Sequence, residues 1–182
     1  MEPRIPGFHG EYLWELDVAR TQLLALAEAV PAGVYGWRPA DGARPFSAVL
    51  VHIAAGNLAL LHLAGAREPD GDGERFAAMI RSNFSLERTV TEKQDVIDLL
   101  RRSFEEVRQA FTESTIEDLE KIGNFFGERT TVRRVFFRML AHTHEHMGQA
   151  IAYARANGLG VPWLDPLKSL DRIAEVPDGI MV

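Results

Sequence analysis

The stretch that most constrains the fold is residues 46–66, FSAVLVHIAAGNLALLHLAGA, which carries no Asp, Glu, Lys or Arg. As a helix it is long enough to cross a bilayer. However, His52, Asn57 and His62 interrupt it, and no other segment of the chain resembles it. We therefore predict a helix that is buried on nearly all sides inside a soluble protein, not a membrane span. The N-terminal sequence lacks the apolar run of a signal peptide, so the expected compartment is the cytoplasm.

Apolar side chains at helical spacing predict four long helices and no convincing set of strands. The helices are expected at about residues 10–30, 47–65, 91–112 and 130–158. Residues 67–90 read as a long connection with a short helix near residues 76–80. Four helices with apolar faces indicate an all-α four-helix bundle.

Residues typical of helix ends mark three of the boundaries. Thr91 and Gln94 have the spacing of a capping box at the start of the third helix. Thr130 or Thr131 is expected to cap the fourth helix, and Gly158 is placed to end it.

Length and composition are those of one globular domain. The chain has 182 residues, of which 46% are hydrophobic and 25% charged, and we predict a single domain over residues 1–182. Its net charge of -6 argues against a nucleic-acid-binding protein, which usually carries a basic face. It contains no cysteine, so a thiolate metal site and a disulfide are both impossible.

Three histidines lie close together in the segment RMLAHTHEHMGQAIAYARANG, residues 138–158. His142 and His146 are four residues apart, so on a helix they are offset by only about 40° and can reach one ion. His144 lies about 200° from His142 and cannot join them without breaking the helix.

His52 is the best third ligand that the sequence offers. It lies on an apolar face of its helix, which we expect to point into the bundle, whereas Asn57 points roughly the opposite way. An unpaired imidazole in a core costs roughly a few kcal/mol, and a metal ion would relieve that cost. Spacing alone leaves two interpretations open, a metal site or histidines that merely pack. His9, His62 and His144 are expected to be ordinary surface or hydrogen-bonded residues.

Three motifs in this order resemble the DinB/YfiT-like superfamily: VYGWRP at 34–39, VLVHIAAGNLALL at 49–61 and HTHEHMGQAIAYARANGLGVP at 142–162. The family pattern has one histidine in the second helix, then a distant H-x-x-x-H followed by x-G-Q. It maps onto His52, His142 and His146, with MGQ at 147–149. His144 is additional, and Met147 stands where the family often has arginine. The likeness covers about residues 10–165, the expected core, and leaves residues 167–182 as a C-terminal tail.

The resemblance implies an up-down-down-up bundle, usually a homodimer, in which His52, His142 and His146 hold one divalent ion. The family includes transferases and isomerases that use a low-molecular-weight thiol, so we expect a metal-dependent transferase or hydrolase that activates a thiol or water. The substrate is an unknown small molecule, and no nucleic-acid or membrane partner is expected. A non-catalytic metal-binding or interaction bundle is the alternative. All-imidazole ligation favours Zn or Ni.

Four residues near the histidine pair are expected to line the substrate pocket. Arg138, Gln149 and Tyr153 share the face of His142 and His146, and Glu145 lies about 60° from it. Arg138 could hold an anionic group, although a surface ion pair is the simpler interpretation.

The helix at 47–65 also has apolar side chains on its Asn57 side, among them Leu50, Leu58 and Leu61. That side needs a cover, which either the 67–90 connection or a second copy of the chain could provide. The family likeness favours a homodimer, in which charged substitutions at Leu50 or Leu61 would weaken association.

Overall fold

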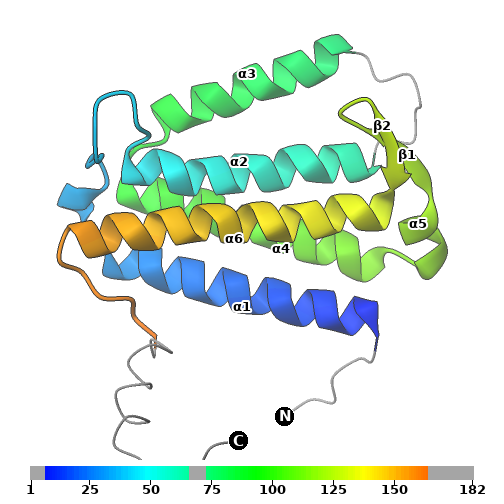
Figure 1. Ribbon diagram of the computed structural model, residues 1–182, viewed down its shortest axis with the longest axis horizontal. Coiled ribbons are helices and arrows are strands. Elements are labelled where there is room, and N and C mark those ends of the chain that lie inside the picture. Colours follow the sequence, from blue (N-terminus) through cyan, green and yellow to red (C-terminus); the bar gives the residue numbers. More distant parts are fainter. Residues whose placement is uncertain (1–6, 66–72, 164–182) are drawn as a thin grey trace, which may run out of the picture.

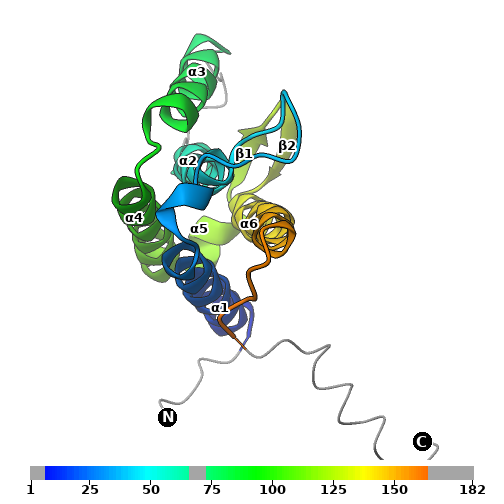
Figure 2. The same cartoon turned by 90° about the vertical axis from the view of Figure 1, so that its left-hand side faces the viewer.

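Four long helices pack side by side in the computed structural model of the chain, which describes residues 7–65 and 73–163. They are α1 (Phe8–Ala29), α2 (Phe46–Gly65), α4 (Lys93–Glu113) and α6 (Val132–Ala156). In the end-on view α2 lies between α4 and α6, and α1 closes the bundle on the other side (Figure 2). The predicted all-α four-helix bundle is confirmed.

The helices follow an up-down-down-up order, because α1 and α6 run one way and α2 and α4 the other (Figure 1). Neighbouring helices that run in the same direction need a crossover between them. The helix α3 (Gly73–Thr89) provides it, lying along the outer side of α2 (Figures 1 and 2). The predicted short helix at residues 76–80 was therefore too short.

The helix α2 is buried on nearly all sides, as its sequence predicted, since it packs against α3, α4 and α6. Within the described residues it is the only helix long and apolar enough to cross a membrane, and 67% of its apolar window is buried. This burial fits the central helix of a soluble protein. Leu50 is fully buried and Leu61 is partly buried, so the chain itself covers the patch that we expected to form a two-fold interface. The homodimer stays a prediction, but this patch is no longer its expected interface.

The orientation of α2 differs from the prediction. Asn57 is buried, where its side chain bonds to Ser103 of α4 and Thr143 of α6, each at 3.4 Å. The Asn57 side of α2 therefore faces the centre of the bundle. A buried amide is tolerated there because it has hydrogen-bond partners. The His52 side chain is 24% exposed and lies at the edge of the α2–α6 contact.

Two of the three predicted helix boundaries are correct. Thr131 caps α6 by accepting a hydrogen bond from the Arg134 backbone N–H, and Gly158 follows the helix with φ of 74°. The predicted capping box at Thr91 is wrong. The N-cap of α4 is Glu92, which makes no side-chain cap, and the Gln94 side chain instead bonds to Asp98.

The segment between α4 and α6 contains short elements, although no convincing set of strands was predicted. It forms a short helix, α5 (Ile116–Glu120), and an antiparallel hairpin of β1 (Ile122–Phe125) and β2 (Glu128–Thr131). A short 3-10 helix, η1 (Ala32–Val34), lies between α1 and α2. The hairpin was missed because its two-residue turn has a phenylalanine, Phe126, at positive φ, where Asn or Asp is the usual signal.

Candidate metal centre

The three histidines that the sequence singled out lie together where α2 packs against α6. His52 comes from α2, and His142 and His146 come from successive turns of α6. One ring nitrogen from each lies within 4.8 Å of those of the other two. The Nε2 atoms of His52 and His142 are 3.2 Å apart. This cluster brings imidazoles from distant parts of the chain to one point.

Gly56 makes room for the imidazole ring of His142. A Cβ built at Gly56 would clash with the Cε1 atom of His142 and lie 2.9 Å from its Nδ1. The two helices can therefore approach each other at this level only because position 56 has no side chain. Gly56 lies one turn after His52 in α2, so the same helix provides both a cluster histidine and the space for the His142 ring.

Hydrogen bonds orient two of the three rings. The Nδ1 of His52 lies 2.7 Å from a carboxylate oxygen of Glu87 in α3. A carboxylate accepts, so His52 carries its proton on Nδ1 and has a lone pair on Nε2. The Nδ1 of His146 lies 3.0 Å from Gln149 Oε1, while Gln149 Nε2 donates to the Tyr153 hydroxyl at 3.0 Å. This arrangement gives His146 the same tautomer.

His142 differs because its Nδ1 is buried without a hydrogen-bond partner. Burial, followed by the charges of His146 and His52, lowers the pKa of His142 to about 3. Burial also lowers the pKa of His52, helped by the charge of Arg44 and opposed by Glu87. Both rings are therefore neutral near pH 7, which is the form that binds metal ions.

The residues present fit a divalent metal ion. At bonds of about 2.1 Å, two adjacent ligands are about 3.0–3.4 Å apart, and the separation of the His52 and His142 Nε2 atoms, 3.2 Å, falls in that range. Two of the rings have their other nitrogen bonded to a carboxylate or an amide, the usual outer partners of metal-bound histidine. An ion bound by the Nε2 atoms of His52 and His142 would leave the buried Nδ1 of His142 without a hydrogen-bond partner.

The four predicted pocket residues separate into two pairs. Arg138 and Glu145 form a two-bond ion pair, at 2.9 and 2.8 Å, on the exposed side of α6. This pair lowers the pKa of Glu145. Gln149 and Tyr153 continue inward from His146, and Trp37 packs against the Tyr153 ring at a centroid distance of 5.4 Å. Gln149 is thus a direct neighbour of a cluster histidine.

The remaining histidines lie outside the cluster, as expected. His144 faces α1, where its Nε2 is 4.0 Å from a Glu15 carboxylate oxygen. His62 is exposed near the C-terminal end of α2, and the ring of His9 lies against Phe111.

Two residues of the site were missed by the sequence analysis, Glu87 and Arg44. The Arg44 guanidinium donates to the Glu87 carboxylate at 2.7 and 3.4 Å, so Glu87 joins Arg44 to His52. Glu87 falls in the segment that was predicted to be mostly a connection. Asn83 and Glu87, one turn apart, both bond to α2, and this polar i, i+4 pair is the signal that could have indicated a helix face.

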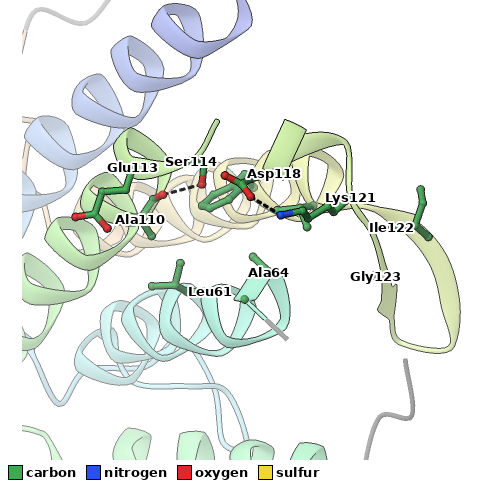
Figure 3. Close-up of a pocket in the computed structure, with 12 residues that line it drawn as sticks. Leu61, Ala64, Ala110, Glu113, Ser114, Asp118, Lys121, Ile122 and Gly123 are labelled. Carbon is green, nitrogen blue, oxygen red and sulfur yellow. Dashed lines mark hydrogen bonds and ion pairs between the residues drawn. The ribbon is translucent and has the colours of Figure 1, made fainter. Parts of the chain in front are cut away.

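A pocket of about 630 Å³ lies at the other end of the bundle (Figure 3). Its walls come from the C-terminal ends of α2 and α4, from α5 and β1, and from the first turns of α6. Lys121 and Asp118 at its rim bond to each other, and the hydrogen bonds from Lys121 and Thr115 lower the pKa of Asp118 (Figure 3). Leu61 in its wall is nine residues beyond His52, about 13 Å along the helix, so the pocket is separate from the histidines.

Comparison with known proteins supports the resemblance. The family model of the DinB superfamily matches residues 15–150. No curated protein sequence matches the chain.

Several solved structures share the fold. A DinB-like protein from Bacillus cereus ATCC 10987 superposes with a TM-score of 0.69 at 20% identity, over 87% of this chain and 97% of that one. A DinB-like protein from Bacillus subtilis, YjoA, gives a TM-score of 0.62 at 19% identity, over 84% and 96%. The mycothiol-dependent maleylpyruvate isomerase gives 0.59 at 15% identity, over 78% of this chain and 59% of that one. At these identities the likeness establishes the fold.

Proposed function

The chain belongs to the DinB superfamily, and from that premise we propose that it is a metal-dependent enzyme whose ion is held by His52, His142 and His146. The observation that carries the proposal is the convergence of three imidazoles from α2 and α6, two of them with Nε2 lone pairs set by outer hydrogen bonds. Three protein ligands leave positions for water or substrate, which is typical of catalytic rather than structural metal sites.

The donor set favours a borderline transition metal. Imidazole nitrogens suit Zn or Ni, whereas Mg and Ca prefer oxygen ligands. The chain has no cysteine that could add a thiolate. We therefore propose one zinc or nickel ion per chain.

The proposed reaction is a transfer or hydrolysis that uses a thiol or water as the nucleophile. Such an ion, when bound, lowers the pKa of a bound water or thiol and polarises the bond to be broken. Because the protein has no thiol, any thiol must come from a small molecule, such as the mycothiol on which the maleylpyruvate isomerase depends by its name. A cytoplasmic location, which we also propose, keeps such thiols reduced.

The protein's own residues would orient the ligands and the substrate. Glu87 and Gln149 hold His52 and His146 in the tautomer that presents Nε2. Arg138 lies one turn before His142 and could bind an anionic substrate group if its pair with Glu145 opened. Tyr153 places a hydroxyl behind Gln149.

A non-catalytic metal-binding bundle is the second candidate. It is favoured by the pairing of Arg138 with Glu145, since the two charged residues predicted for the substrate pocket are bonded to each other.

Metal analysis of the purified protein tests the shared part of both candidates. We expect about one ion per chain in the wild type, and a loss of most of it in His52→Ala, His142→Ala and His146→Ala. His144→Ala is the matched control, because its ring lies beside Glu15 on the other side of α6 and should leave metal content unchanged. Full metal retention in His142→Ala would contradict the assignment. A screen for thiol transfer and hydrolysis with the metal-loaded protein then separates the enzyme from the binding bundle.

A further inference from the structure

The helix α3 lies outside the four-helix bundle and packs on it through α2. It packs along the outer side of α2 (Figure 2). None of its described side chains is buried, and Phe84 is 49% exposed. Leu86 packs against the core cluster while remaining only partly buried. Among the described side chains of α3, hydrophobic burial is therefore smaller than in the bundle helices.

Polar contacts near the C-terminal end of α3 join it to α2 and to Arg44. Asn83 donates to the backbone oxygen of Ala55 at 3.3 Å. Glu87 accepts from His52 at 2.7 Å and from Arg44 at 2.7 and 3.4 Å, and its side chain is only 9% exposed. A carboxylate with little exposure is stable only while it keeps such partners. The docking of α3 thus depends on a bond to one of the three cluster histidines.

We propose that Glu87 is a positioning residue that couples the metal ion at His52 to the docking of α3 on α2. The inference rests on the proposed metal site. An ion on Nε2 draws electron density from the ring and makes the Nδ1 proton a stronger donor to the Glu87 carboxylate. Arg44 holds that carboxylate from the other side and fixes its position.

The coupling is reciprocal. If a docked Glu87 raises the metal affinity by a given factor, the metal stabilises the docked α3 by the same factor. Loss of an outer partner of a metal ligand typically lowers metal affinity about 10- to 100-fold. We therefore expect zinc to lower the population of undocked α3 by about 10-fold or more, and the metal-free protein to hold its four-helix bundle with a looser α3.

Two measurements on the full chain test this inference. Zinc affinity is measured by competition with a chelating dye for the wild type, Glu87→Gln and Glu87→Ala. We expect a loss of about 10-fold for Glu87→Gln, which keeps an acceptor without charge, and more for Glu87→Ala. Arg44→Ala should weaken zinc binding when it is introduced into the wild type. It should have no further effect when it is added to Glu87→Ala, because Arg44 acts through the Glu87 carboxylate. Glu105→Gln removes an exposed carboxylate from α4 and is the matched control.

Hydrogen exchange of the α3 amides, with and without zinc, separates coupling from a purely structural role. In the wild type and in Glu105→Gln, zinc should slow exchange at residues 80–89, and in Glu87→Gln that difference should largely disappear. Equal loosening of α3 by Glu87→Gln in both states, with zinc affinity within twofold of the wild type, overturns the coupling and leaves the metal site standing. Absence of both zinc and nickel binding by the wild type overturns the proposed function, and this inference with it.

Discussion

At the scale of single residues, the cluster histidines and Gln149 were predictable, and the supports from α2 and α3 were not. The i, i+4 spacing of His142 and His146 follows from helix geometry, and the family pattern added His52. Glu87 reaches His52 only because α3 returns along α2, and no local pattern encodes that contact. The role of Gly56 could not be predicted either, because it depends on the His142 ring from α6.

Gly56→Ala is expected to lower metal affinity about tenfold or more, because the new methyl group occupies the space of the His142 ring. The ring can escape only by leaving its position beside His52. The measurement is zinc affinity by dye competition, accompanied by circular dichroism to confirm that the helices remain.

Gly148→Ala is the matched control for this substitution. Gly148 is an exposed glycine of α6, next to the histidine pair, and a Cβ there would meet no atom within 4 Å. It should leave zinc affinity unchanged and stabilise the protein by up to about 1 kcal/mol through helix propensity. Equal zinc affinities for the two alanine variants would show that His142 does not need the space at position 56.

At the scale of elements, the long amphipathic helices were found from apolar spacing, and the short or polar elements were not. The start of α4 was misplaced because Thr91 and Gln94 match a capping box by spacing, although the helix begins after Glu92. The capping box that does form, Thr115 with Asp118, opens the five-residue helix α5, which is too short to show periodicity. The hairpin strands have four residues each and no alternating pattern.

The C-terminal end of α6 at Gly158 was predicted correctly, and a substitution there tests its physical cause. Gly158 has φ of 74°, and the N–H groups of Gly158 and Leu159 bond back to Arg155 and Ala154, which closes the helix. Gly158→Ala should destabilise the protein by about 1 kcal/mol, because an L-residue is strained at this φ. The measurement is the urea midpoint at constant m-value.

Gly160→Ala is the control two residues later, since Gly160 has no positive φ and a Cβ there would meet nothing within 4 Å. It should be neutral or slightly stabilising. Both variants should bind zinc as the wild type does, because Gly158 is twelve residues from His146, about 18 Å along the chain axis of α6. A destabilisation as large in Gly160→Ala would show that loss of flexibility, not backbone strain, is responsible.

At the scale of the whole molecule, the bundle owes its topology to α3. Four apolar helix faces are compatible with several connectivities, and only the family likeness indicated the up-down-down-up order. The structure supplies the physical reason: α2 and α4 are parallel neighbours, and α3 carries the chain back between them (Figure 1). The same helix brings Glu87 to His52, so the connection that makes the fold possible also supports the candidate site.

Metal binding and the stability of the bundle should be linked. The bundle has a large apolar core of its own, with Leu23, Phe46, Ile53, Phe104 and Phe136 all almost fully buried. It should therefore fold without an ion, unlike a zinc finger. At a free zinc concentration 100 times the Kd, binding stabilises the protein by about 2.7 kcal/mol. For a chain of this size that corresponds to a rise in Tm of about 5–10 °C.

A chelator should remove this increment and leave the far-ultraviolet helical signal nearly unchanged. His52→Ala serves as the control, because its Tm should be the same with and without chelator. If chelation instead abolished most of the helical signal of the wild type, the ion would be part of the core, and the argument from the apolar residues would fail.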